Sequence, residues 1–289
     1  MKQYIYIIYA MIAVVAFTAC GDDRQPAVSN DNLRPMTISV VTDRPPKTRA
    51  ESSETSSVSR YAISVWEDEA CTEPATVFAD ENNHATSATG SFSMILDRTK
   101  SYYCLFWADN ETGYTLDTAL KNIVLSDGSE TAEAFCGKTT IPEGTSSTYT
   151  VTLKRAVAKI TLKETNEMPA GNTMTVTFDR HTVFNVLNGT SGTPNPHTVT
   201  WTTTAKSGTE ASPVRLNDED IFALAPISTA SVNNIIFQCN DEGEVMVSNV
   251  PLQANYNTSI KGHYTTVSDQ TFTVNYNDGW DGDNTLAEF

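Results

Sequence analysis

An alternation of apolar and polar side chains with a period of two residues recurs along this 289-residue chain. Because successive side chains of a β-strand point to opposite faces of a sheet, this period is typical of half-buried strands. No long stretch has the 3.6-residue period of a helix, so the sequence predicts an all-β fold. The clearest alternating segments are Tyr61-Ile63-Val65, Phe92-Met94-Leu96, Met174-Val176-Phe178, Val199-Trp201 and Val245-Val247.

Two segments depart from this simple alternation. Residues 102–107 are apolar at both parities, which predicts a central strand that is buried on both faces. A short helix is expected near 116–121, between two of the predicted strands.

An isolated apolar patch at 36–42 lies between two polar segments. Met36, Ile38 and Val40 alternate with small hydroxyl residues, so the patch predicts a first strand. The flanking segments are rich in Asp, Pro, Ser, Thr and Glu, which favours a flexible tether over 20–35 and a long loop over 43–59. A lone strand between two loose segments must add to a sheet built elsewhere.

The alternation changes phase near Arg155. Val151 and Leu153 define one face, whereas Ala158 and Ile160 continue with the opposite parity. A shift of one residue exchanges the two faces of a strand, which indicates a bulge or a passage from one sheet to another. We therefore predict two domains, 36–155 and 156–289, each of ordinary β-sandwich size.

The first 21 residues have the features of a bacterial lipoprotein precursor. Lys2 precedes an apolar run that is too short to span a bilayer comfortably, and the small Ala19 precedes Cys20. The interpretation is a signal peptide over 1–19 and a lipidated Cys20 that tethers the mature chain to the outer membrane. Each buried methylene of an acyl chain contributes about 0.8 kcal/mol. The alternative is an uncleaved N-terminal anchor helix.

The composition narrows the class of partner. Lys and Arg number 19 against 35 Asp and Glu, and the formal charge of −16 argues against nucleic acid as a partner. No catalytic, phosphate-binding or dinucleotide motif occurs, so no enzyme activity and no cofactor are predicted. The four cysteines after Cys20 lack metal-ligand spacing, so no metal is predicted. Cys71 with Cys136 is the disulfide pair to test, and the redox state of all four is left open. These four are Cys71, Cys104, Cys136 and Cys239.

Several motifs, in this order, resemble the fimbrillin family of the Bacteroidota, the pilin superfamily of type V pili. Together with the lipoprotein signal, the resemblance extends over nearly the whole chain. The matching stretches are Thr48-Arg49-Ala50, Tyr102-Tyr103-Cys104-Leu105-Phe106-Trp107-Ala108-Asp109, Leu153-Lys154-Arg155-Ala156-Val157-Ala158-Lys159-Ile160, Val250-Pro251-Leu252-Gln253-Ala254-Asn255-Tyr256-Asn257-Thr258 with Ile260-Lys261-Gly262, and Asp278-Gly279-Trp280.

The resemblance implies two tandem transthyretin-like Greek-key β-sandwich domains and an assembly by strand exchange. In the family, a trypsin-like protease cuts after an arginine in the loop behind the first strand. That strand then leaves, and a strand from a neighbouring pilin fills its groove. Arg49, before the small Ala50, is the preferred cleavage site; Arg44, Lys47 and Arg60 are the other candidates.

The strand exchange needs an acceptor groove and a donor strand. Removal of Met36, Ile38 and Val40 would expose a sheet edge and three apolar pockets, each worth about 1.5–3 kcal/mol when filled. A segment near the C-terminus has the alternation that a donor needs, and it can equally be the last strand of the second sandwich. Its apolar residues are Phe272, Val274 and Tyr276.

The sequence leaves the exact role open. The leading hypothesis is a stalk or tip subunit of a surface fimbria that binds other pilin subunits. The alternatives are a pilus anchor and a lipid-anchored adhesin for a host or glycan ligand, for which Trp66, Trp201 and Trp280 are the residues to inspect. The tripeptide around Thr118 resembles the O-glycosylation tripeptide of the phylum and makes Thr118 a candidate site.

Overall fold

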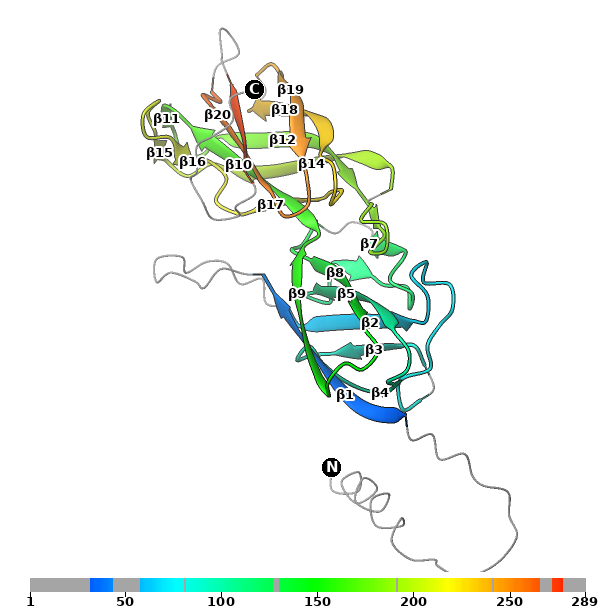
Figure 1. The fold of residues 1–289 in the computed structure, drawn as a ribbon. Helices are drawn as coiled ribbons and strands as arrows, with labels where there is room; N and C mark the ends of the chain where they lie inside the picture. Colours follow the sequence, from blue (N-terminus) through cyan, green and yellow to red (C-terminus); the bar gives the residue numbers. More distant parts are fainter. Residues whose placement is uncertain are drawn as a thin grey trace, which may run out of the picture. The chain divides into compact units, whose positions relative to one another are not determined.

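The structure is a computed structural model that describes residues 32–43, 58–80, 82–126, 130–190, 192–240, 242–265 and 272–277. Within these ranges all regular structure is β, which confirms the predicted all-β class (Figure 1). The helix expected near 116–121 is wrong: this segment is a turn in which the carboxylate of Asp117 accepts hydrogen bonds from the amides of Lys121 and Asn122, both at 2.9 Å. No helix among the described residues is long and apolar enough to span a bilayer.

The N-terminal part forms a seven-stranded sheet with the order β3-β2-β5-β8-β9-β1-β4. Its central strand β5 pairs with β2 on one side and β8 on the other, and nearly all of its side chains are buried, as predicted from residues 102–107. The bounds are β1 Leu33–Thr42, β2 Arg60–Trp66, β3 His84–Ser87, β4 Ser91–Asp97, β5 Tyr102–Asp109, β8 Phe135–Ile141 and β9 Thr148–Arg155.

The C-terminal part forms a nine-stranded sheet whose main order is β19-β18-β12-β17-β10-β20-β21. Two further strands extend it, since β14 pairs with β12 and β16 pairs with β10. The bounds are β10 Val157–Glu164, β12 Thr173–His181, β14 Pro194–Thr202, β16 Val214–Arg215, β17 Ile221–Leu224, β18 Ser231–Cys239, β19 Val245–Leu252, β20 Asn257–Gly262 and β21 Thr273–Asn277.

Two small sheets complete the strand pairing. Strands β6 (Tyr114–Thr115), β7 (Ile123–Leu125) and β13 (Val183–Phe184) form one of them, in the order β13-β7-β6. Strands β11 (Glu167–Met168) and β15 (Lys206–Ser207) form the other.

Three apolar clusters fill the interior. One lies against the seven-stranded sheet and contains Ile38 and Phe106, and a second lies against the nine-stranded sheet and contains Phe178 and Ile260. The third gathers residues from both parts of the chain, including the fully buried Trp107. The first two clusters follow from the alternation, because each sheet must bury its apolar face.

The phase change near Arg155 coincides with the end of one strand and the start of the next. β9 ends at Arg155 in the seven-stranded sheet, and β10 begins at Val157 in the nine-stranded sheet. The buried Arg155 forms an ion pair with the buried Glu133, with Nε and Oε1 at 2.7 Å. The division into domains 36–155 and 156–289, like the transthyretin-like topology, stays a prediction.

Candidate functional site

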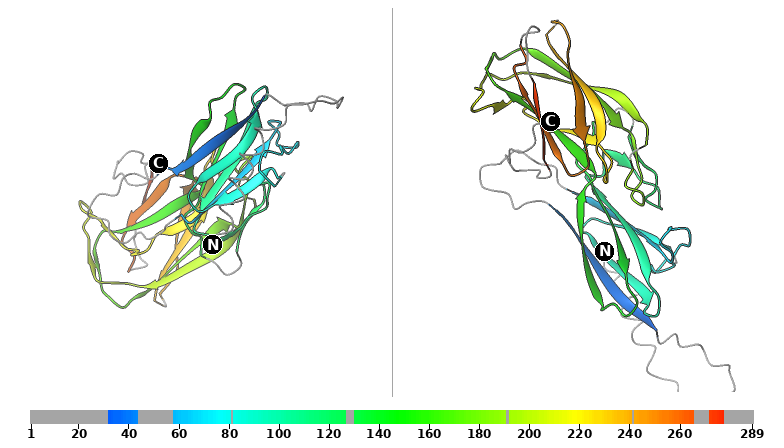
Figure 2. Two further views of the ribbon diagram at one scale, coloured as in Figure 1. Left: turned by 90° about the horizontal axis from the view of Figure 1, so that it is seen from below. Right: turned by 45° about the horizontal axis from the view of Figure 1, so that its top comes forward.

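The first strand, β1, is enclosed by neighbours on both sides. It pairs antiparallel with β4 from Leu33 to Ser39 and parallel with β9 from Thr37 to Thr42. The strand is three residues longer at its start than the predicted 36–42 segment. β1 is therefore an inner strand for part of its length, and its blue ribbon runs along β4 and β9 in Figure 2. Loss of β1 would leave backbone groups unpaired on both β4 and β9, whereas the sequence predicted a single row of unpaired groups.

The inward face of β1 carries the three apolar residues that the alternation singled out. Met36 and Val40 are each 5% exposed and Ile38 is fully buried. They pack in the cluster that also contains Phe92 and Phe106. Full burial of a side chain of this kind contributes about 1.5–3 kcal/mol, so three of them hold β1 firmly in its sheet.

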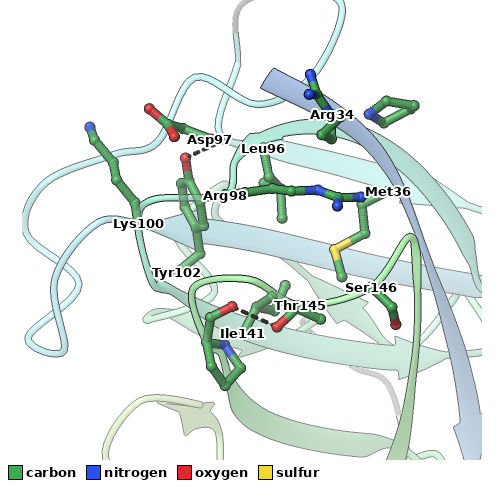
Figure 3. Close-up of a pocket in the computed structure, with 12 residues that line it drawn as sticks. Arg34, Met36, Leu96, Asp97, Arg98, Lys100, Tyr102, Ile141, Thr145 and Ser146 are labelled. Atoms are coloured by element: carbon green, nitrogen blue, oxygen red, sulfur yellow. Dashed lines mark hydrogen bonds between the residues drawn. The ribbon is translucent and has the colours of Figure 1, made fainter. Parts of the chain in front are cut away.

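At its start, β1 borders a small cavity. The side chain of Met36 points into it, beside Tyr102 and the 142–146 segment (Figure 3). The Tyr102 hydroxyl accepts a hydrogen bond from the amide of Asp97 at 3.1 Å, and burial raises the pKa of this phenol. The cavity measures about 20 Å³, roughly the space for one water, so it is too small for a ligand.

At its other end, β1 is fixed by backbone contacts. The Val40 amide donates to the carbonyl of Gly90 at 2.8 Å, and the Asp43 amide donates to the carbonyl of Leu153 at 2.8 Å. Arg155 donates from Nη1 to the Asp43 carbonyl at 3.2 Å. The residue that ends β9 thus also holds the end of β1, immediately before the predicted cleavage loop.

Arg60 is a poor cleavage site in this fold. It is the first residue of β2, and its guanidinium contacts both oxygens of the buried Asp109 carboxylate, at 2.9 and 2.6 Å. Nη2 also donates to the carbonyl of Tyr114 at 2.8 Å. A trypsin-like protease must bind an arginine side chain in its own pocket, so this pairing argues against Arg60.

The remaining cleavage residues and the lipidation site lie outside the described residues. These are Arg44, Lys47, Arg49, Ala50 and Cys20. Their predicted roles stay predictions.

The candidate donor strand is paired within the C-terminal sheet. β21 pairs antiparallel with β20, and Phe272 stacks on Phe237 with ring centroids 5.8 Å apart. Val274 packs against the same core, and Tyr276 stacks on Tyr256 at 4.6 Å. All three predicted residues are half-buried. The structure thus has this segment as a strand of its own sheet, and a donor role requires it to leave β20.

Two of the tryptophans singled out for glycan contact are buried or partly buried. Trp66 is 8% exposed, its Nε1 donates to the Ser64 hydroxyl at 3.0 Å, and the ammonium of Lys121 lies 4.4 Å from its ring centroid. Trp201 is half-buried and packs against the second core. Trp280 lies outside the described residues. Trp66 is therefore unavailable to a sugar, and Trp201 is only partly exposed.

The other predicted positions can be placed individually. Thr118 is exposed in the 117–120 turn, so its hydroxyl is accessible for the glycosylation that stays a prediction.

Cys71 and Cys136 are free thiols, so the disulfide to be tested between them is not formed. The other two described cysteines are also free and buried. Burial raises the pKa of Cys136 to about 12. Among the described residues, no group of His, Cys, Asp and Glu could hold a metal.

Sequence reasoning missed three contacts that position β1 and β2. The sequence signal for one of these contacts was Asp109, because a charged residue that ends an apolar strand is buried and needs a partner. The Glu133–Arg155 pair and the contact between Gly90 and Val40 join residues too distant in sequence for any local pattern to connect them.

Three solved structures of bacterial proteins are similar to this chain over most of its length. A protein of Bacteroides thetaiotaomicron that is proposed to bind polysaccharides (DUF1812) has a TM-score of 0.50 at 11% identity, over 83% of this chain and 95% of that one. A proposed cell adhesion protein from Bacteroides ovatus has a TM-score of 0.49 at 14% identity, over 86% and 99%. The fimbrial anchor protein Mfa2 from Porphyromonas gingivalis has a TM-score of 0.43 at 11% identity, over 86% and 98%.

At these identities a likeness to solved structures concerns the fold alone. The fimbrillin-like resemblance predicted from the sequence is confirmed at that level. No curated protein matches the sequence. The model of a family of unknown function, DUF6562, matches residues 29–288, which is most of the chain, and the chain therefore belongs to that family.

Proposed function

We propose that this chain is a structural, non-enzymatic subunit of a cell-surface fimbria that assembles by protease-triggered strand exchange. It would be exported as a lipoprotein through Cys20 and reach the outer surface of the outer membrane. Its partners would be other copies of itself or homologous pilin subunits. A fimbrial or adhesin-like role agrees with the fimbrillin-like fold.

The observation that supports this proposal is the position of β1. The strand lies between β9 and β4 and is the first of the described strands, so it can leave without the displacement of a strand that precedes it in the described part of the chain. Its departure would leave two unpaired edges and the pockets of Met36, Ile38 and Val40. Such a groove is suited to a new strand with the same alternation.

The cleavage that frees β1 is proposed at the Arg49–Ala50 bond. Of the other three candidates, Arg60 is paired with Asp109, and Arg44 precedes Pro45, a bond that trypsin-like proteases resist. Lys47 remains as a secondary site. A cut at Arg49 would leave β2 and its ion pair intact, because β2 begins eleven residues later at Arg60.

The donor is proposed to be the segment that carries Phe272, Val274 and Tyr276. It presents three apolar side chains at the same spacing as the three that β1 would vacate. It lies at the end of the strand order and pairs only with β20 among the described strands, so its release breaks one ladder.

The test is limited digestion of the purified chain with a trypsin-like protease. We expect a new N-terminus at Ala50, loss of the fragment that carries β1, and a ladder of oligomers on a sizing column. Arg49→Ala should abolish the new N-terminus at Ala50 and strongly reduce the other two, because only the secondary site Lys47 is left, whereas Lys47→Ala should leave all three unchanged. A cut chain that stays a monomer with β1 bound would contradict strand exchange and favour a pilus anchor or a monomeric surface adhesin.

A further inference from the structure

Among the described strands, β19 and β21 are edge strands of the C-terminal sheet, and a groove lies between them. β19 and β21 are the two ends of its main strand order. The groove measures about 820 Å³ and is lined by Ala230, by the 247–251 part of β19, by Phe272 and by the 273–276 part of β21. The red strand β21 lies beside β20 in Figure 1, and β19 continues into β20 through a short connection.

The two walls of this groove run in the same direction. β21 is antiparallel to β20, and β19 reverses into β20 over the four residues 253–256. The Thr258 hydroxyl donates to the Pro251 carbonyl at 2.6 Å, and Thr258 is opposite Tyr276 in the β20–β21 ladder. Pro251 and Tyr276 therefore lie at the same end of the groove. An incoming strand can therefore be antiparallel to both walls, the arrangement with the more stable hydrogen-bond ladder.

The chemistry of the groove favours an uncharged extended strand. None of its nine described lining residues is charged, in a chain that has 54 charged residues, 35 acidic and 19 basic. Phe272, Val274 and Tyr276 offer three positions at the two-residue spacing of a strand, over a length of about 14 Å. Free edges with apolar flanks bind an added strand through backbone hydrogen bonds and side-chain pockets.

Exposed apolar side chains continue this surface around the edge of the sheet. Met246 is 58% exposed and pairs with Ile236 of β18. Val232 is 67% exposed and pairs with Pro251. Both pairs involve β19, the strand that forms one wall of the groove.

We infer that the groove between β19 and β21 binds the β1 strand of a second copy of this chain. Met36–Val40 is uncharged and has three apolar residues at alternate positions, which matches the length and spacing of the wall. The inference rests on the proposed function, because cleavage must free β1 from its own sheet before β1 can bind a second copy. It concerns copies in which β21 is still paired with β20, because β21 cannot be a wall and a donor at once.

The test uses the uncut chain with Cys20→Ser and a labelled peptide of sequence Leu33–Thr42. In the uncut chain β1 fills its own groove, so the peptide cannot bind there and is free to bind the β19–β21 groove. We expect one peptide to bind per chain, measured by fluorescence anisotropy. A peptide with Ile38→Asp should bind at least tenfold more weakly.

Groove variants locate the binding site. Val274→Asp and Ser248→Arg should each weaken binding at least tenfold, and Ser248 is exposed, so its replacement leaves the fold intact. Val41→Asp on the outer face of β1 is the control that should bind as the parent does, since Val41 is 46% exposed and far from the groove in sequence and sheet. Equal binding by the parent and Ser248→Arg would overturn the inference, as would no binding at all.

A chain that ends at Asn277 tests whether the chain's own C-terminal residues bind in the groove instead of β1. Equal binding by this chain and the full chain supports β1 of a second copy. Binding that appears only after the removal of 278–289 would assign the groove to the chain's own C-terminus and overturn the inference. Failure of peptide binding to the uncut chain would leave the protease-triggered oligomers intact, so the two proposals fail separately.

Discussion

Asp109 holds the guanidinium of Arg60 through both carboxylate oxygens, at 2.9 Å from Nε and 2.6 Å from Nη2. The same carboxylate accepts hydrogen bonds from Nε1 of Trp107 and from the Glu111 amide, both at 2.8 Å. Asp109 is fully buried, so its charge depends on these partners. The pair fixes the first residue of β2, the strand that follows the predicted cleavage loop.

Asp109→Ala should lower the free energy of unfolding by about 3–5 kcal/mol, because it leaves the Arg60 charge without its partner. Urea unfolding measures the change. The control is Glu67→Ala, which breaks the exposed pair with Lys100 and should cost about 0–1 kcal/mol. Equal losses in the two variants would show that the Arg60–Asp109 pair is not a structural anchor. Digestion of Asp109→Ala should also reveal cleavage after Arg60, which we expect the parent chain to resist.

Gly90→Ala should weaken the hold on β1. Gly90 has φ +73°, and an added Cβ would lie 2.7 Å from the Val40 carbonyl oxygen. Gly144 has nearly the same φ, +72°, with open space around its Cβ position, so Gly144→Ala isolates the cost of the backbone conformation, about 1–2 kcal/mol. Gly90→Ala should cost more than this, with faster hydrogen exchange at the Val40 amide. Similar losses in both variants would mean that the contact with Val40 is unimportant.

Ile38→Ala should lower stability by about 2–5 kcal/mol, because it creates a cavity at the centre of the buried face of β1. Val41→Ala on the exposed face of the same strand should change stability by no more than about 0.5 kcal/mol. Thermal unfolding of both variants checks the difference. A small effect of Ile38→Ala would count against a tightly held first strand and against the strand-exchange proposal.

Strand β21 should lose stability in alkaline solution. Burial, with a contribution from Tyr256, raises the pKa of Tyr276 from 10.0 to about 12. Below pH 10 the phenol is neutral in both folded and unfolded chains; as the pH rises from 10 towards 12, only the unfolded chain releases the proton, which favours unfolding. Several tyrosines should titrate late in tyrosinate absorbance, and Tyr276→Phe should remove the titration near pH 12. Titration of Tyr276 at its ordinary pKa would contradict the burial of its hydroxyl.

Sequence patterns predicted strands best where the apolar residues that become buried are close neighbours in the chain. Residues 102–107 are apolar at both parities and form the buried β5, and the alternation at 36–42 marks the inward face of β1. Residues 116–121 failed as a helix because the Asp117 carboxylate caps a turn there. Asx turns of this kind compete with helical hydrogen bonds, and composition alone does not distinguish them.

The sequence by itself determined the β class, the inward residues of the first strand and the family resemblance, because a period of two is a property of neighbouring residues. Only the tertiary structure decided that β1 has neighbours on both sides, that Arg60 is held by Asp109, and that β19 and β21 border an uncharged groove. These relationships join residues tens of positions apart. Strand order and side-chain pairing are set by packing between sheets, and no local pattern in the chain encodes them.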